Sequence, residues 1–343
     1  MKITYTIFII ILAILASSFC VHYYNTTTPL PLVIPKGWPK PSKQFFANNT
    51  ITEQGFQLGR KLFYDGQLSK DGNFACATCH QQFAAFSTFD HDFSHGFNNG
   101  LTSRNAPSLV NLAWMKDFHW DGGINHLEVQ PLAPLTAPNE MAETIQNVIK
   151  KLNADVTYKK MFTAAFGPGP INSQKFLKAL AQFTGSIISY NSKYDKVINS
   201  QATFTISEQM GYTFFKANCN GCHSEPLFTD NSYRNIGLNI NEKLNDKGRM
   251  GITGLQSDSL KFKVPTLRNI TLTAPYMHDG RFGTLGQVFE HYKTGINFKQ
   301  PNVDTILHNR LVMSTQQKFD LIAFLHTLKD EELLNNKKFG PPN

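Results

Sequence analysis

Two copies of one five-residue motif constrain this chain more than any other feature. Each copy has two cysteines separated by two residues and followed directly by a histidine, at residues 76–80 and 219–223. This is the attachment signature of c-type haem: both thiols add to the porphyrin and the histidine binds the iron. A redox dithiol or half of a zinc site would explain one cysteine pair, but not a repeated pair with histidine in both copies.

The motifs therefore predict two covalently attached haem c groups and two proximal histidines, His80 and His223. Covalent attachment keeps a haem bound even where its surroundings are polar. The predicted attachment residues are Cys76, Cys79 and His80 in the first copy, and Cys219, Cys222 and His223 in the second.

The segments that precede the two motifs are weakly similar. A helical pattern opens at 52–54 before the first motif, and another opens at 207–209 before the second. Both begin with a hydroxyl residue and an early acid, which are favoured at helix N-termini. A chain of 343 residues is long enough for two cores. We therefore expect two related haem domains, over 51–195 and 196–335, with their junction in the polar stretch 191–206.

The hydrophobic pattern favours a mainly α fold with two cytochrome c-like haem domains and long loops. Amphipathic helices are expected at about 140–152, 173–190 and 315–329, the last with a capping box formed by Ser314 and Gln317. Residues 95–139 are rich in Gly, Asn and Pro, so they are expected to form a long loop.

The N-terminus has the composition of an export signal. Lys2 is followed by an apolar run over 7–21, so residues 1–24 are expected to be a cleaved signal peptide or a membrane anchor. The proline-rich stretch 25–50 is expected to be a flexible tether. Export predicts a periplasmic location, with anchoring to the inner membrane as an open alternative.

The charge of the chain argues against a nucleic-acid partner. There are 33 basic and 25 acidic residues, a formal net charge of +8, with no arginine-rich run and no reader motif. A diffuse positive charge instead favours contact with acidic surfaces. A homodimer is compatible with these features, and the sequence does not decide it.

Several blocks between and after the motifs add a more specific signal. Together with the motifs, they closely resemble the bacterial di-haem cytochrome c peroxidases and their relatives, the methylamine-utilisation-type di-haem oxidases, over roughly residues 50–330. The resemblance implies a peroxidatic N-terminal haem, an electron-accepting C-terminal haem and a calcium ion near the domain interface. The blocks are 103–109, 118–123, 130–134, 139–141, 264–269 and 273–280.

The resemblance assigns catalytic roles to three residues. Glu140 matches the carboxylate that acts as acid and base at the peroxidatic haem, with Gln130 alongside it. Cleavage of hydrogen peroxide needs such a group, which takes a proton from one oxygen and returns it to the leaving oxygen. Trp120 matches an aromatic residue between the two haems that assists electron transfer.

The resemblance also implies residues that bind calcium and haem. Asn105 matches a calcium ligand through its side chain, and Thr273 and Pro275 match ligands through their backbone carbonyls. Hard oxygen donors of this kind suit calcium. His278 is expected to contact a haem propionate.

The sixth iron ligands are less uniform within the family. His95 is the expected displaceable ligand of the N-terminal iron, with His91 as an alternative. Many of the peroxidases have methionine as the sixth ligand of the C-terminal iron, whereas this chain has Tyr292, as the methylamine-utilisation-type oxidases do. Three other candidates for that position remain: His291, Met277 and Met313.

Three functions are therefore considered. The first is a peroxidase that reduces hydrogen peroxide to water with electrons from a small periplasmic donor, a cytochrome c or a cupredoxin. The second is a di-haem oxidase that acts on side chains of a partner protein, an alternative supported mainly by Tyr292. The third is a di-haem electron carrier without enzymatic activity, against which Glu140 and Gln130 argue.

The two motifs predict the haem content directly. In a host that attaches c-type haem, the denatured chain should carry the added mass of two haems. Replacing Cys219 and Cys222 by Ala should leave one haem, because the first motif remains intact. A wild-type protein with one haem or none by mass spectrometry would contradict the assignment.

Overall fold

The computed structural model describes residues 27–41, 43–309 and 311–342. It confirms the prediction of a mostly helical protein, with one two-stranded antiparallel sheet. The predicted signal or anchor at 1–24 lies outside the described residues. Among the helices of the described ranges, none is both long and apolar enough to span a membrane.

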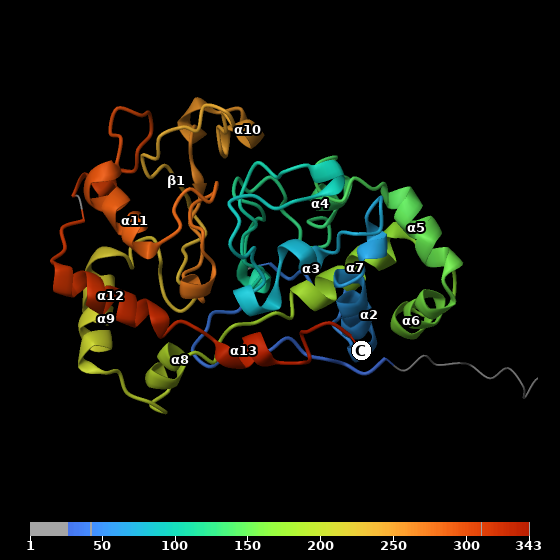
Figure 1. The fold of residues 1–343 in the computed structure, drawn as a ribbon. Coiled ribbons are helices and arrows are strands. Elements are labelled where there is room, and N and C mark those ends of the chain that lie inside the picture. Colours follow the sequence, from blue (N-terminus) through green and yellow to red (C-terminus); the bar gives the residue numbers. More distant parts are fainter. Residues whose placement is uncertain (1–26, 42, 310, 343) are drawn as a thin grey trace, which may run out of the picture.

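The N-terminal half lies at the right of Figure 1 and the C-terminal half at the left. Short 3₁₀ turns connect many of the elements. The N-terminal half contains α2 (Glu53–Phe63), α3 (Cys76–Cys79), α4 (Leu132–Thr136), α5 (Ile145–Ala154), α6 (Val156–Phe166) and α7 (Ser173–Thr184). The remainder contains α8 (Lys193–Ile198), α9 (Ile206–Asn218), β1 (Tyr233–Arg234), α10 (Met250–Thr253), β2 (Phe262–Lys263), α11 (Leu285–Glu290), α12 (Thr315–His326) and α13 (Glu331–Asn335).

Each half is organised around one close crossing of two helices. In the N-terminal half α2 packs on α7, and a Cβ atom at Gly59 would lie only 2.0 Å from the carbonyl oxygen of Ala179. In the C-terminal half α9 packs on α12, and a Cβ atom at Gly211 would lie 1.9 Å from the carbonyl oxygen of Asp320. Glycine therefore allows the helix before each haem motif to approach its partner closely.

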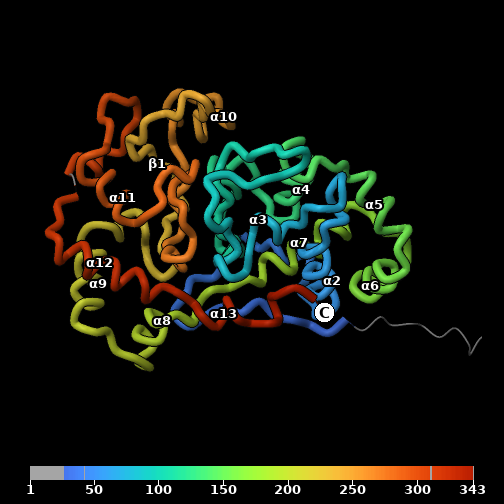
Figure 2. Tube along the Cα trace, viewed as in Figure 1, coloured from blue at the N-terminus to red at the C-terminus, as the bar shows by residue number. Residues whose placement is uncertain are grey.

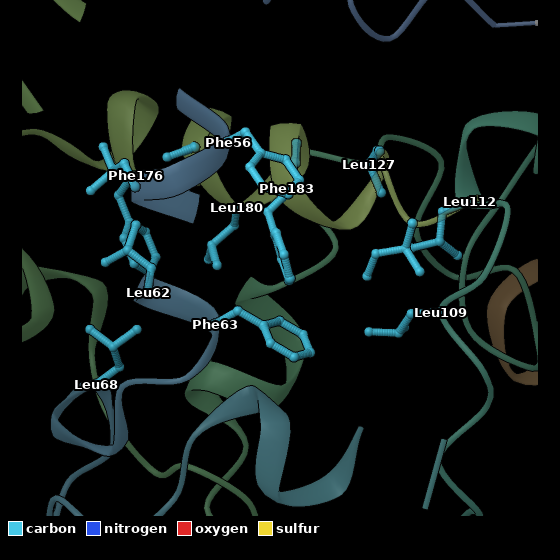
Figure 3. Close-up of a cluster of buried hydrophobic side chains, with 14 of the residues drawn as sticks. Phe56, Leu62, Phe63, Leu68, Leu109, Leu112, Leu127, Phe176, Leu180 and Phe183 are labelled. Carbon is cyan, nitrogen blue, oxygen red and sulfur yellow. The ribbon is translucent and has the colours of Figure 1, made fainter. Parts of the chain in front are cut away.

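Phenylalanine side chains fill both cores. Phe63 and Phe183 pack with ring centroids 5.1 Å apart at the centre of the N-terminal core, which Figure 3 shows. Phe215 and Phe324 are also 5.1 Å apart in the C-terminal core. Burial of these large aromatic side chains contributes to the stability of both halves.

The two halves are not simply consecutive. After α12 the chain returns beneath the molecule to the N-terminal half, as the tube in Figure 2 shows. There the hydroxyl of Tyr64 donates to the carbonyl of Phe339 at 2.8 Å, and Arg60 Nε donates to the carbonyl of Gly340 at 2.6 Å. The predicted boundaries at 51–195 and 196–335 stay predictions, but α13 packs with the N-terminal half.

The described part of 25–50 differs from the flexible tether that the sequence predicted. Phe45 is buried in the N-terminal core, and Trp38 packs edge-on against Trp114 at 5.1 Å. Trp114 Nε1 also donates to the carbonyl of Pro39 at 2.7 Å. The prolines do produce an extended chain, but its aromatic side chains attach it to the protein.

The predicted helices exist, with different ends. The helix expected at 140–152 begins at Ile145, because the Thr144 hydroxyl caps it by accepting from Asn147 N. The helix expected at 173–190 ends at Thr184, since residues 187–189 turn away to bond with Asn111.

The last two helices also differ slightly from the prediction. The helix expected at 315–329 ends at His326, and its predicted capping box of Ser314 and Gln317 is present. The helix expected from Ser207 begins at Ile206 and is capped by Thr205.

A buried ion pair joins α8 to the 264–269 block. The guanidinium of Arg268 donates to both carboxylate oxygens of Asp195 at 2.8 Å, and only 1% of Arg268 is exposed. The ring of Trp38 covers the guanidinium at 4.6 Å. The junction region is therefore held by a desolvated charge pair as well as by apolar packing.

We predict that Asp195→Ala strongly destabilises the protein. The substitution leaves the Arg268 charge buried without a partner, which typically costs about 3–5 kcal/mol. Glu331→Ala is the control: that carboxylate also pairs with a cation, Lys329, at 3.0 Å, but its side chain is 72% exposed. Such a pair contributes about 1 kcal/mol or less. Urea unfolding should separate the variants, and equal losses would contradict the role of the buried pair.

Candidate functional site: a haem cavity shared by both halves

Both haem motifs face one cavity of about 990 Å³ between the two halves. Cys79 and His80 line it from the N-terminal half, and Cys219, Cys222 and His223 line it from the C-terminal half. The first motif lies on α3, and the second follows directly after α9. The volume is at the upper end of the range for ligand pockets and the walls are mainly apolar, as large planar cofactors require.

The two proximal histidines are oriented in the same way. Nδ1 of His80 lies 3.0 Å from the carbonyl oxygen of Phe86, and Nδ1 of His223 lies 3.2 Å from that of Phe228. A carbonyl oxygen can only accept, so each Nδ1 carries the proton and each Nε2 keeps its lone pair. Burial lowers the pKa of both rings, that of His80 to about 4. Both imidazoles are therefore neutral, as iron ligation requires.

Burial raises the pKa of all four motif cysteines, those of Cys76 and Cys219 to about 12. Redox-active cysteines instead have a lowered pKa and an electropositive setting. These four cysteines therefore lack the usual character of a reactive dithiol.

One buried polar atom near the first motif also fits a haem group. His119 Nε2, in a residue that lines the cavity, has no hydrogen-bond partner among the described residues. Buried polar atoms normally have partners. The donor set and the cavity together fit two haem groups, held by the six motif residues.

Glu140 and Gln130 lie on the cavity wall of the N-terminal half, as His80 does. Glu140 is in the turn before α5, where its backbone carbonyl accepts from Phe97 N at 2.7 Å. Burial raises the pKa of its carboxyl, and its charge is close enough to raise the pKa of the Cys79 thiol. The structure therefore brings the predicted acid–base residue to the N-terminal haem position.

Trp120 lies at the seam, which is the region where the N-terminal and C-terminal halves contact each other. Its Nε1 donates to the carbonyl of Asn105 at 2.8 Å, and its own carbonyl accepts from Lys263 N at 2.7 Å. Lys263 belongs to β2 of the C-terminal half. Trp120 also lines the shared cavity, and its predicted location between the haems stays a prediction.

The predicted calcium residues lie along the same seam. Asn105 N donates to the carbonyl of His278 at 2.8 Å, and Asn105, Thr273 and Pro275 all line the cavity. Within the described ranges there is no cluster of three or more His, Cys, Asp or Glu residues suited to a metal ion. A calcium site made of neutral oxygen donors stays a prediction.

His278 is buried and stacks on Phe262, with ring centroids 3.7 Å apart. Burial lowers its pKa to about 4, so its ring is neutral. It lines the cavity, where it can meet a haem edge. Its predicted contact with a propionate stays a prediction.

The structure does not bring the predicted sixth ligand of the N-terminal iron to the cavity. His95 and His91 are both exposed, and their rings lie 5.4 Å apart on the surface loop. Neither belongs to the cavity wall. Ligation by either histidine would need a rearrangement of this loop.

Tyr292, by contrast, lines the cavity beside the second motif. It lies in the π-helical turn His291–Gly295, and burial together with the nearby Cys219 and Cys222 thiols raises the pKa of its phenol. π-Helical turns are frequent at functional sites.

Two of the three alternatives to Tyr292 are engaged elsewhere. His291 Nε2 lies 2.9 Å from the carbonyl of Ile236, and Met313 packs against the C-terminal core. Met277 also lines the cavity, so it remains a candidate.

Comparison with known proteins agrees with this site. A family model described as di-haem cytochrome c peroxidase matches residues 53–203. The methylamine utilization protein MauG of Methylorubrum extorquens is 34% identical over 297 residues, which cover 82% of this chain and 80% of that protein. The chain belongs to the di-haem cytochrome c peroxidase family.

Other relatives of this di-haem family member support the assignment. The cytochrome c551 peroxidase of Nitrosomonas europaea is 34% identical over 239 residues, covering 68% of this chain and 71% of that protein. A crystal structure of a MauG-like protein associated with microbial copper homeostasis superimposes with a TM-score of 0.83 at 32% identity, covering 91% and 99% of the two chains. Membership implies an oxidoreductase with two haem c groups, but the relatives include both peroxidases and MauG proteins.

One ionic cluster of this di-haem protein was not singled out from its sequence. Arg104 Nη1 donates to Asp121 at 2.5 Å, and its Nε donates to Asp246 of the C-terminal half at 2.7 Å. Arg104 thus joins the two halves at the cavity wall. Its partners lie 17 and 142 residues away, so no local pattern could have revealed the cluster.

We predict that Tyr292→Phe changes the C-terminal haem and leaves the N-terminal haem unchanged. A phenolate ligand stabilises ferric iron, so its loss should raise the potential of that haem and replace its low-spin signal. Electron paramagnetic resonance and a redox titration measure both effects. Tyr276→Phe is the control, because Tyr276 also lines the cavity and burial raises its pKa to about 12. A Tyr292→Phe spectrum and potential equal to the wild type would assign Tyr292 to packing alone.

Proposed function

We propose that this protein reduces hydrogen peroxide to water with electrons from a small periplasmic donor protein, a cytochrome c or a cupredoxin. The observation that carries the proposal is the position of Glu140 on the cavity wall of the N-terminal half, together with Gln130 and the proximal His80. A simple electron carrier has no need of a half-buried carboxyl at this place. The reaction consumes two electrons and two protons for each peroxide and yields two water molecules.

Glu140 moves the proton in this proposal. As a carboxylate it takes a proton from one oxygen of the peroxide. It then returns that proton to the other oxygen, which leaves as water. Burial raises the pKa of its carboxyl, which brings proton release closer to neutral pH and so favours both transfers. A haem held by Cys76, Cys79 and His80 would supply the iron that accepts the peroxide and the electrons that reduce it.

Gln130 and Trp120 complete the proposed machinery. Gln130 lies on the same wall as Glu140, where its amide can hold the peroxide by hydrogen bonds. Trp120 contacts Asn105 of the N-terminal half and Lys263 of the C-terminal half, so it offers an aromatic step for electrons that cross the seam. Calcium bound by Asn105, Thr273 and Pro275 would order that seam.

A second function is favoured by one specific observation. Tyr292 lies on the cavity wall close to Cys219 and Cys222, where many peroxidases of the family have methionine. An anionic oxygen ligand there would favour higher oxidation states of iron. In this alternative the protein uses peroxide to oxidise side chains of a partner protein, as a methylamine-utilisation-type oxidase does.

We predict that Glu140→Gln lowers peroxide turnover by a factor on the order of 10² or more, because it removes the proton shuttle. Turnover is measured from the oxidation of reduced cytochrome c by peroxide. Glu128→Gln is the matched control, since Glu128 is half-buried and lies outside the cavity wall. Haem content should stay the same in both variants.

The outcomes distinguish the proposals. Turnover of Glu140→Gln within twofold of the wild type would remove Glu140 from the catalytic role. Slow oxidation of every small donor by the wild type, together with rapid consumption of peroxide, would favour the oxidase alternative.

A further inference from the structure

The carbonyl that holds each proximal histidine belongs to a phenylalanine in an unusual backbone conformation. Phe86 has φ +58° and Phe228 has φ +56°, in the left-handed region that residues with a Cβ atom rarely adopt. Both side chains are fully buried, Phe86 against Phe63 and Phe228 against Phe215. Two bulky residues with the same strained backbone at the same place point to a functional constraint.

A second segment fixes this turn in the N-terminal half. The hydroxyl of Ser108 donates to the carbonyl of Ala85, the residue before Phe86, at 2.5 Å. The next residue, Leu109, donates its N–H to the Phe86 carbonyl at 3.2 Å. The Phe86 oxygen thus accepts from Leu109 and from His80, one donor for each lone pair.

The C-terminal half repeats these three bonds and adds a second carbonyl, that of Pro265, beside the proximal histidine. The hydroxyl of Thr266 donates to the carbonyl of Leu227, the residue before Phe228, at 2.6 Å. Leu267 donates its N–H to the Phe228 carbonyl at 3.3 Å, beside the bond from His223. In both halves the hydroxyl residue follows a proline, and the carbonyl of Pro265 lies 3.1 Å from His223 Nδ1.

We propose that Ser108 and Thr266 are positioning residues that hold the Phe86 and Phe228 carbonyls against the proximal histidines and so set the potential of each haem. A strong bond from Nδ1 to a fixed carbonyl makes the imidazole a better electron donor, which stabilises ferric iron. Without the hydroxyl, the strained turn can relax toward a more favourable backbone conformation. The carbonyl then moves away from the imidazole, and ferrous iron becomes easier to form.

A purely structural role predicts a different result. In that case the hydroxyls only satisfy a half-buried carbonyl in a turn, and their loss lowers stability without changing either haem. The potential of each haem therefore separates the two roles. The proposal rests on haem attachment alone, so it stands whether the protein is a peroxidase or an oxidase.

The test uses the full-length holoprotein with Ser108→Ala or Thr266→Val and a spectroelectrochemical redox titration. Ser108→Ala should raise the potential of the N-terminal haem only, and Thr266→Val that of the C-terminal haem only. At the wild-type midpoint, the ferrous-to-ferric ratio should rise on the order of tenfold, which corresponds to 59 mV for one electron. Ser108→Thr and Thr266→Ser keep the hydroxyl and should restore the wild-type values.

Two other hydroxyls serve as matched controls. Ser186 donates to the Gln182 carbonyl at 2.6 Å and Thr184 donates to the Leu180 carbonyl at 3.0 Å, both at the end of α7. Ser186→Ala and Thr184→Val therefore lose a comparable bond away from the histidines and should leave both potentials unchanged.

Three results would overturn the proposal: unchanged potentials in the test variants, a shift of both haems by either single variant, or equal shifts in the controls. Where a test variant does not accumulate as holoprotein, Ser108→Gly or Thr266→Ala removes the same hydroxyl with less bulk. The same expectations apply to these variants.

Discussion

The interior of this molecule is organised around a cavity of about 990 Å³ into which both haem motifs face. Protein interiors are normally packed as densely as organic crystals, so a cavity of this size sets this interior apart. Two haem groups held by the motif cysteines would fill it, and their thioether bonds would hold them independently of the packing. We therefore expect folding and haem attachment to be linked.

The shared cavity also explains why the halves do not behave as separate units. Arg104 joins Asp121 and Asp246 across the seam, and the Trp120 carbonyl accepts from Lys263. The C-terminal tail packs back on the N-terminal core. These contacts fix the relative positions of the two haem motifs.

Duplication is the second organising feature. In each half a glycine allows a close helix crossing, Gly59 in one and Gly211 in the other, just before the haem motif. In each half the proximal histidine contacts the carbonyl of a phenylalanine whose backbone is in the left-handed region. The halves differ in other parts of the cavity wall, to which one contributes Glu140 and the other Tyr292. The repeated scaffold positions the two attachment motifs, and the differing side chains distinguish their surroundings.

The sequence by itself determined the haem attachment residues, the mainly helical fold and the helix caps, because each depends on residues within a few positions of one another. Glu140, Gln130 and Trp120 could be named through the family resemblance, although the sequence placed Glu140 at the start of a helix and the structure places it in the turn before one. Only the tertiary structure decided that the segments 27–41 and 43–50 pack on the protein, that His95 lies away from the cavity and that Arg104 joins the halves. Those features depend on contacts between distant segments, and a local pattern carries no information about which distant surface a side chain will meet.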